Sequence, residues 1–538
     1  MTEENTTVSK HLKILLLFTV LIAYSYSFHG KAYDNALSRL DLTFSLALHG
    51  TLNIDAYHGN TIDKAYYEGH YYSDKAPGLS LAAVPAVAIL KNVFPAVEWS
   101  PDNMYARFAI TLLLVGIPSV FLAFLLINLT RNITGMDSLV TTFVYSLGSL
   151  ALPYSVMFYS HQFCAVLLVA AFYIHYQNRS GASVPNFTNG ALTGLLAGYA
   201  VVCEYPAAVP AALIAGSAFL SCGNIRHRAG LAAGVIIPLV ILGAYNYAVF
   251  EHPLRIGYEY EVNQWFKAEM GKGIGGVGIP KPGVILHLLG APQRGLFWAQ
   301  PFLLLSIPGL YLLFSKDRKR RTAALISGGI ILAAILINAG YYEPYGGFAP
   351  GPRFLVLSLP FWFLAAATCW AAGGTVTRAM AAGAGMLSVI YYSLITLVEP
   401  HVPHVFNAPL FNFTIPLVRA GWEPANIATV LGTPGLWSVV PLLLLISICT
   451  ILILIYEFRG HDLFESAGGI MSGFLAVAVV FLITTYVSKP DPALNSYYIG
   501  TALNGNGRYE AAEGYLTYSV SLRPELAQAR YAMGIAQI

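Results

Sequence analysis

The chain has 538 residues, of which 56% are hydrophobic and only 11% are charged, and its mean hydropathy is +0.60. Soluble domains carry roughly 25% charged residues, so this composition excludes a water-soluble enzyme. The formal charge of +3 is too small to indicate a nucleic-acid-binding protein. The five cysteines lack CxxC spacing and therefore indicate neither a disulfide framework nor a zinc site.

Apolar stretches recur along the chain and predict an all-α polytopic membrane protein. About 20 apolar residues are needed to cross a bilayer as a helix. The first stretch, 12–28, has no small-residue cleavage site, so we interpret it as an uncleaved span rather than a signal peptide. Further stretches bring the predicted transmembrane helices to thirteen: 105–128, 136–152, 159–177, 188–203, 205–221, 229–250, 296–314, 322–340, 354–371, 378–398, 435–456 and 467–487.

The stretch 79–94 is too short for a span, because 16 residues reach only about 24 Å across a hydrocarbon core of ~30 Å. We predict that it lies at the interface. The N-terminus and the basic cluster at 316–321 then fall on the cytoplasmic side of the cell (inner or plasma) membrane, as the positive-inside rule prefers. Residues 29–104, 251–294 and 399–434 become outer loops.

The tail, 488–538, is predicted to be a separate module outside the membrane. Gly500, Tyr509, Ala512, Leu516 and Pro524 occupy positions that a tetratricopeptide repeat requires. About three repeats are usually needed for stability, so either the tail packs on the membrane domain or the natural protein was longer. The alternative is an amphipathic helical hairpin with accidental spacing. A repeat module would bind an acceptor or a partner protein.

The first outer loop carries several candidate site residues. Apolar residues at helical spacing over 34–48 predict a surface helix whose polar stripe contains Asp34 and Asp41. Lys75 directly precedes an Ala-Pro-Gly turn just before the interfacial stretch, where a cation can meet a lipid phosphate without entering hydrocarbon. The same segment, 60–78, also supplies four other candidates: Asp63, His70, Tyr72 and Asp74.

Two arginines are placed at the outer mouths of spans. Arg353 ends the segment GGFAPGPR, and Arg294 lies in APQRGL. A guanidinium offers two parallel donors to a phosphate and stays charged near the membrane, so both are candidate phosphate ligands. The alternative is an arginine that only extends its charged end to the interface.

Two further candidates lie at predicted span ends. His161 follows an aromatic segment and either binds substrate or caps local structure. Glu204 stands between two short apolar halves, and a carboxylate at membrane depth indicates function by default. In the second loop, Tyr258, Glu259, Glu261 and Trp265 are suited to face a sugar, but nothing in the sequence fixes their geometry.

The segments DKAPG (74–78) and GPRFL (351–355) resemble elements of the GT-C glycosyltransferases, in the branch of the bacterial aminoarabinose transferase and the protein O-mannosyltransferases. The resemblance implies a GT-C-type bundle over 1–487 with interfacial helices in the first outer loop. It also implies a polyprenyl-phosphate-linked sugar as donor and a site outside the cytoplasm.

The resemblance also implies a catalytic Asp near the start of the first outer loop. That position falls near Asn35, beside Asp34, so this chain departs from the pattern. An inverting transfer needs a general base to take the acceptor's proton. We rank Asp63 first for this role, Asp41 second and Asp34 third.

The sequence therefore predicts a membrane glycosyltransferase that moves a sugar from a polyprenyl-phosphate carrier to an extracytoplasmic lipid, glycan or protein. No cofactor is required and no metal ligands are assigned, although nearby carboxylates leave Mg²⁺ or Mn²⁺ open. Two alternatives of other classes are a lipid-linked sugar flippase or transporter and a non-catalytic scaffold for the repeat module. A transporter would place ionisable groups near the bilayer midplane, whereas here they gather at one surface.

Overall fold

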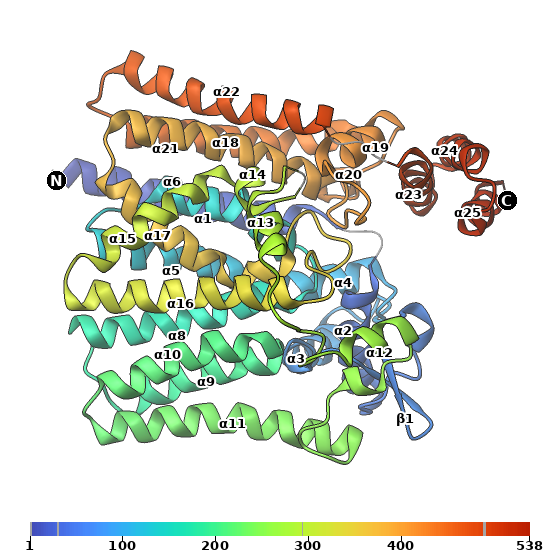
Figure 1. Ribbon diagram of the computed structural model, residues 1–538, viewed down its shortest axis with the longest axis horizontal. Helices are drawn as coiled ribbons and strands as arrows, with labels where there is room; N and C mark the ends of the chain where they lie inside the picture. The colour runs from blue at the N-terminus through green and yellow to red at the C-terminus, as the bar shows by residue number, and fades with distance from the viewer. Residues whose placement is uncertain (1–2, 29–31, 293, 488–490, 538) are drawn as a thin grey trace.

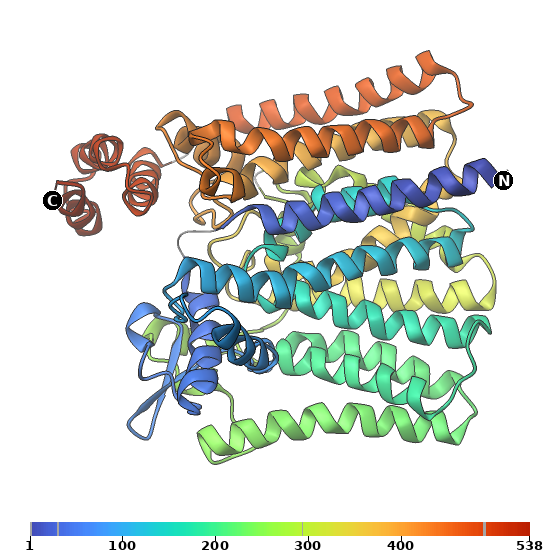
Figure 2. The same cartoon turned by 180° about the vertical axis from the view of Figure 1, so that it is seen from behind.

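The computed structural model describes residues 3–28, 32–292, 294–487 and 491–537. Long helices run side by side in one bundle, and the connecting segments lie at its two ends (Figures 1 and 2). Each predicted apolar stretch is occupied by a helix or a broken helix. The bundle contains α1 (Glu3–Tyr26), α4 (Met104–Thr111), α5 (Ile117–Thr134), α6 (Leu139–Leu147), α7 (Ala151–Ser155), α8 (Ser160–Ser180), α9 (Phe187–Cys203), α10 (Ala208–Ser221), α11 (Ile225–Phe250), α14 (Leu296–Ala299), α15 (Ser306–Phe314), α16 (Arg318–Gly340), α17 (Leu359–Ala372), α18 (Thr375–Val398), α21 (Val440–Glu457) and α22 (Leu463–Val487).

The bundle has the dimensions of a multi-pass membrane protein. Within the described residues, eight helices are long and apolar enough to cross a membrane, and four shorter apolar helices accompany them. The all-α polytopic architecture is therefore confirmed, whereas the number of thirteen spans stays a prediction. The predicted boundary at 487/488 adjoins 488–490, which lie outside the described residues.

Small elements cover one end of the bundle. They are α2 (Asp34–Phe44), β1 (Lys64–Tyr67), β2 (His70–Ser73), α3 (Gly78–Val93), α12 (Gln264–Met270), α13 (Pro282–Gly290), α19 (Ile415–Arg419) and α20 (Ile427–Val430). The helix α3 runs across the bundle direction rather than along it (Figures 1 and 2), which agrees with the predicted interfacial position. A Cβ on Gly78 would lie 2.6 Å from the Cys203 backbone nitrogen, so this glycine lets α3 pack closely on the end of α9.

Glycines hold α9 and α11 together. A Cβ on Gly190 or Gly194 would overlap a carbonyl oxygen of α11, and one on Gly230 or Gly234 would overlap a carbonyl oxygen of α9. Small residues of this kind let two membrane helices approach backbone to backbone, where dispersion contacts are densest. The two helices therefore pack backbone to backbone at these glycines.

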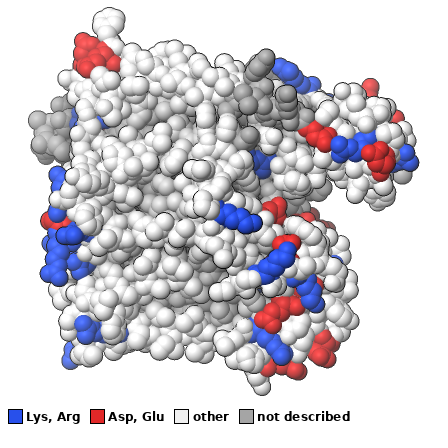
Figure 3. Space-filling model, viewed as in Figure 1, with Lys and Arg blue, Asp and Glu red and all other residues white. Residues whose placement is uncertain are grey.

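The two ends of the bundle differ in charge. The N-terminus and the basic cluster at 316–321 lie at the same end, where Lys13 pairs with Asp137 (Nζ to Oδ2, 2.6 Å) and Lys319 donates to the Ser180 carbonyl (3.0 Å). Figure 3 shows lysines and arginines along this edge and a mixture of both signs at the opposite end. The positive-inside rule predicts that the basic end is cytoplasmic.

The tail forms α23 (Pro492–Gly505), α24 (Tyr509–Leu522) and α25 (Ala527–Gln537). The helices α23 and α24 pack through Gly500, where a Cβ would lie 2.6 Å from Leu516. The tail also packs on the outer loops, because Arg508 pairs with Glu423 (3.1 Å) and the Tyr498 ring contacts Phe348. Packing on the membrane domain is thus observed, while the tetratricopeptide assignment stays a prediction.

Candidate active site

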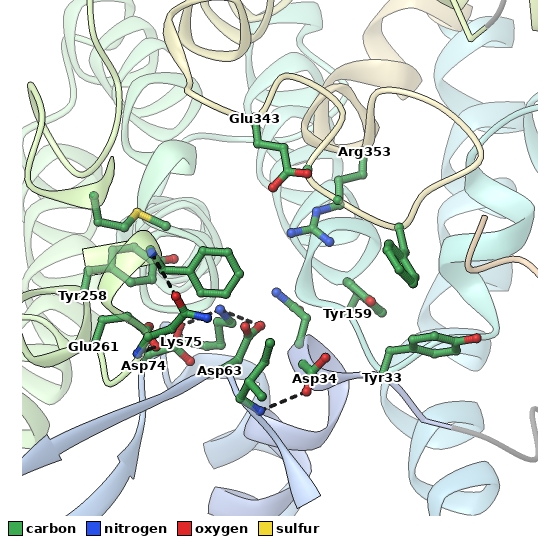
Figure 4. A pocket seen from close by; sticks show the side chains of 18 of the residues that line it. Tyr33, Asp34, Asp63, Asp74, Lys75, Tyr159, Tyr258, Glu261, Glu343 and Arg353 are labelled. Carbon is green, nitrogen blue, oxygen red and sulfur yellow. Dashed lines mark hydrogen bonds and ion pairs between the residues drawn. The ribbon is translucent and has the colours of Figure 1, made fainter. Parts of the chain in front are cut away.

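A cavity of about 750 Å³ lies at the end of the bundle that carries α2 and α12, opposite the N-terminus (Figure 1), and Figure 4 shows it from close by. Its walls come from α2, the residues that flank the β-hairpin, the start of α8, Glu204 at the end of α9, and the segments 258–270 and 341–354. Charged side chains from all of these segments face the same space. The predicted residues that line it are Asp34, Asp63, Asp74, Lys75, His161, Glu204 and Arg353.

The β-hairpin sets the position of Asp63 and Asp74. In its register Lys64 pairs with Ser73, so the two aspartates leave the paired strands side by side. The turn contains Glu68 and Gly69, both with positive φ, as a tight two-residue connection requires. The two-residue Glu-Gly turn sets the register of the hairpin, and this register brings both carboxylates next to Lys75.

Lys75 is buried and doubly paired. Its Nζ lies 2.8 Å from Asp63 Oδ2 and 2.5 Å from Asp74 Oδ2. Burial lowers the pKa of Lys75, but attraction to Asp63 and then Asp74 outweighs burial and raises the pKa above its usual value. The Ser38 hydroxyl donates to Asp74 Oδ1 (3.0 Å), and this bond fixes the orientation of the Asp74 carboxylate. With two carboxylates already on it, Lys75 is better suited to orient Asp63 than to hold a phosphate by itself.

Arg353 lies across the cavity from these carboxylates (Figure 4). It begins the 3₁₀ turn Arg353–Ser358, and its guanidinium lies 5.6 Å from the Tyr159 ring centre and 5.1 Å from that of Phe354. Among the described residues, no carboxylate forms an ion pair with Arg353, and its buried Nε has no hydrogen-bond partner. Gly346, at φ +76°, leaves room for the arginine, because a Cβ there would overlap Arg353 Nε. Arg353 is therefore a preformed cation that lacks an anion.

Two further carboxyl groups of the cavity have altered acidity. Burial raises the pKa of Asp34, whose Oδ1 accepts a hydrogen bond from the Ile62 amide (2.9 Å). Burial, and then repulsion from Asp74, raises the pKa of Glu261 well above its usual range. Asp34 and Asp63 face the cavity together (Figure 4), so both remain candidates for the base.

Asp41, the second-ranked base, does not line the cavity. It is fully buried under the loop, where Asn60 donates to its Oδ1 (3.1 Å) and its Oδ2 has no partner among the described residues. Burial raises the pKa of Asp41 to about 8. The predicted helix is present as α2, but the Asp41 side chain does not line the cavity. Asp41 is therefore not proposed as the base.

A buried ion cluster forms the floor of the cavity. Arg39 Nη2 lies 3.0 Å from Glu204 Oε1, and His161 Nδ1 lies 3.2 Å from the same oxygen. The Ser160 hydroxyl also donates to Glu204, and Arg39 donates to Asn35 Oδ1 (2.5 Å). Glu204 is thus neutralised and hydrogen-bonded, which a carboxylate at this depth requires. Sequence reasoning missed Arg39, whose partner lies 165 positions away.

Three other predicted residues are placed elsewhere. Arg294 is buried, and its guanidinium donates to the carbonyls of Phe406 (2.8 Å), Ala349 (2.7 Å) and Pro403. Arg294 therefore connects its own loop to the segments around 349 and 403–406 through hydrogen bonds, and it does not line the cavity. His70 pairs with Asp55 on the exposed hairpin (2.6 Å), and Tyr72 packs near Phe250.

Aromatic side chains complete the walls. Tyr258, Glu261 and Trp265 line the cavity, whereas Glu259 of the same loop does not. Sequence reasoning also missed several residues that line the cavity: Tyr33, Tyr159, Tyr341, Tyr342, Glu343 and Phe348. Flat rings beside hydrogen-bonding groups suit a sugar, which has both an apolar face and hydroxyls. Within the described residues, no group of three or more His, Cys, Asp or Glu side chains is arranged to hold a metal ion.

No family model and no curated protein matches the sequence. Among solved structures, ArnT from Cupriavidus metallidurans bound to undecaprenyl phosphate is similar, with 12% identity and a TM-score of 0.49 over 97% of this chain and 88% of that chain. ArnT in the apo state has 14% identity and a TM-score of 0.48, over 93% and 79% of the chains.

The archaeal oligosaccharyltransferase AglB from Archaeoglobus fulgidus, in complex with an inhibitory peptide and a dolichol-phosphate, has 12% identity and a TM-score of 0.37. That match covers 94% of this chain and 59% of AglB. These are similarities in the course of the chain and not in individual residues.

Proposed function

We propose that the protein is a membrane glycosyltransferase that moves a sugar from a polyprenyl-phosphate carrier to an acceptor outside the cytoplasm. The observation that carries the proposal is one cavity in which carboxylates on one wall face the unpaired Arg353 on the other. A transferase of this kind needs a base for the acceptor and a cation for the leaving phosphate, a few ångströms apart.

A narrow apolar crevice lies beside the cavity. It lies between α10, α16 and the turn after Arg353, and it shares His161, Glu204 and Phe354 with the cavity. Beyond these residues it continues along apolar side chains of the bundle: Pro206, Pro210, Ala334, Ile337 and Leu357. Its volume is only about 10 Å³, so an isoprenoid chain would contact the apolar rim of the crevice rather than enter it.

The reaction follows from this placement. The acceptor hydroxyl oxygen attacks the anomeric carbon while the bond from that carbon to the phosphate oxygen breaks, so the configuration inverts. Asp63 takes the hydroxyl proton, and the electron pair of the broken bond stays on the polyprenyl phosphate. Arg353 stabilises this growing negative charge more in the transition state than in the ground state.

Asp63 remains the preferred base. Lys75 holds its Oδ2 at 2.8 Å, which orients the other oxygen towards the open space. Asp34 is the second candidate, because a buried carboxylate with a raised pKa is a stronger base. Lys75 is a positioning residue in this scheme.

The test is a transfer assay with purified protein, radiolabelled polyprenyl-phosphate sugars and membrane acceptors, with and without chelator. Arg353→Gln is expected to lower turnover by about 10²–10³, the usual effect of removing one preorganised donor. Arg255→Gln removes an exposed arginine of the same outer face and is the matched control. Full activity of Arg353→Gln, or no transfer by the unaltered protein with any such donor, would overturn the proposal in favour of transport or a scaffold.

A further inference from the structure

A second large cavity lies at the opposite, basic end of the bundle. Its volume is about 850 Å³, and it opens between the end of α8, the end of α10 and the starts of α11 and α16. Its lining contains Arg179, His227, Arg318 and Lys319 but no Asp or Glu. We propose that this cavity binds the phosphate headgroup of an anionic membrane lipid.

The positive charge here has no counter-charge within the cavity. Among the described residues, Arg179, Arg318 and Lys319 form no ion pair with a carboxylate. The neighbouring Asp317 caps α16 through the amides of Lys319 and Arg320, and its other oxygen faces Arg320 (3.6 Å). Repulsion between like charges at one spot is costly unless an anion relieves it. The cavity therefore has the electrostatics of a site whose ligand is an anion.

Donors in the cavity are also unused. The Nε of Arg179 and the Nδ2 of Asn178 are buried and have no hydrogen-bond partner among the described residues. A buried donor without a partner is unfavourable, and a guanidinium with a free edge is suited to two parallel bonds to a phosphate. Both groups lie at the end of α8, so they can reach one ligand together.

The rest of the lining is apolar and indicates a lipid rather than a free anion. Leu213, Leu325 and Ile326 line the cavity beside the arginines, and Leu220 and Leu325 are 81% and 59% exposed on the bundle surface. Along α16 the residues change from basic to apolar within one turn after Arg321. This change marks the level at which headgroups meet acyl chains, and basic pockets between helices there recognise anionic headgroups.

The experiment measures lipid retention by the full-length protein, independently of sugar transfer. Protein in detergent is titrated with phosphatidylglycerol, with phosphatidylcholine and, separately, with inorganic phosphate, and bound lipid is counted by native mass spectrometry. One phosphatidylglycerol is expected to bind at least about tenfold more tightly than phosphatidylcholine. Arg179→Gln with Arg318→Gln should abolish that preference.

The matched control is Arg321→Gln, one turn from Arg318, whose guanidinium lies over Phe314 (4.4 Å) and not in the cavity. It should keep the preference within twofold. Equal binding of the two lipids, or an equal loss in the control, would overturn the site in favour of diffuse surface charge. Displacement of the lipid by millimolar phosphate would show that the free anion is the ligand. Should the double variant elute as aggregate, Arg179→Gln alone serves the same comparison.

Discussion

The two cavities at the ends of the bundle are similar in volume, about 750 and 850 Å³, but their charges are arranged differently. The first is lined by six acidic and three basic residues, most of them in ion pairs. The second is lined by two arginines and a lysine without a carboxylate. Paired charges of both signs are oriented and can move a proton, whereas unpaired charges of one sign can only hold an anion.

The largest test of this contrast removes the preferred base. Asp63→Asn keeps the shape of the wall but cannot accept a proton, so sugar transfer should fall by about 10²–10⁴. Asp55→Asn should have no effect, because Asp55 lies outside the cavity in the same loop and pairs with His70 of the hairpin. A larger loss in Asp34→Asn than in Asp63→Asn would assign the base to Asp34 instead.

A smaller effect is expected when the unpaired arginine is displaced without being removed. In Gly346→Ala the new Cβ would overlap Arg353 Nε, and φ of +76° disfavours alanine in any case. A shift of about 1 Å in a group that contacts the reacting phosphate costs about 10² in turnover. Gly347→Ala is the control for strain alone, because φ is +86° there and no atom lies closer than 3.7 Å. Equal losses in the two variants would contradict a role for the position of Arg353.

A third test introduces a carboxylate into the second cavity, so that its charges resemble those of the first. Thr322 lines that cavity one turn after Arg318. Thr322→Glu should pair with the arginines and weaken phosphatidylglycerol binding about tenfold, or about 1.4 kcal/mol. Turnover of the sugar donor should not change. Thr322→Gln has nearly the same size without the charge, and lipid binding by this variant should stay close to that of the natural protein.

The smallest effect concerns the carboxyl group that neither cavity uses. Burial raises the pKa of Asp41 from 3.8 to about 8, so the folded protein holds a proton there that the unfolded chain releases above about pH 4. The contribution of the protonated Asp41 to the stability of the folded protein is complete below about pH 4 and is lost as the pH rises through about 8. The melting temperature should therefore fall by a few degrees between pH 5 and 8, and Asp41→Asn should flatten that slope. An unchanged slope would contradict the raised pKa.

Much of the fold could be predicted because its signals are local. Each apolar stretch became a helix, and Pro85 with the short length of 79–94 correctly indicated a helix that does not follow the bundle. Lys75 and Arg353 could be placed in one cavity because each lies at a segment end on the same face. The pairing of Lys75 was less visible, since it depends on the hairpin register that brings Asp63 beside Asp74.

Other parts of the site carry no local signal. Arg39 and Glu204 meet only after α2 and the α9–α10 connection fold against each other. Arg294 has the sequence surroundings of a phosphate ligand, but three carbonyls from distant loops take up its donors. In both cases the partner is chosen by tertiary packing, which spacing along the chain does not encode.

The glycine contacts between α9 and α11 have a consequence for the reaction cycle. One helix of this pair leads directly into Glu204, and the other leads into the segment that carries Tyr258 and Glu261. Because the two backbones meet at these glycines, a displacement of one helix is expected to move the other, so Glu204 and the segment that carries Tyr258 and Glu261 should move together.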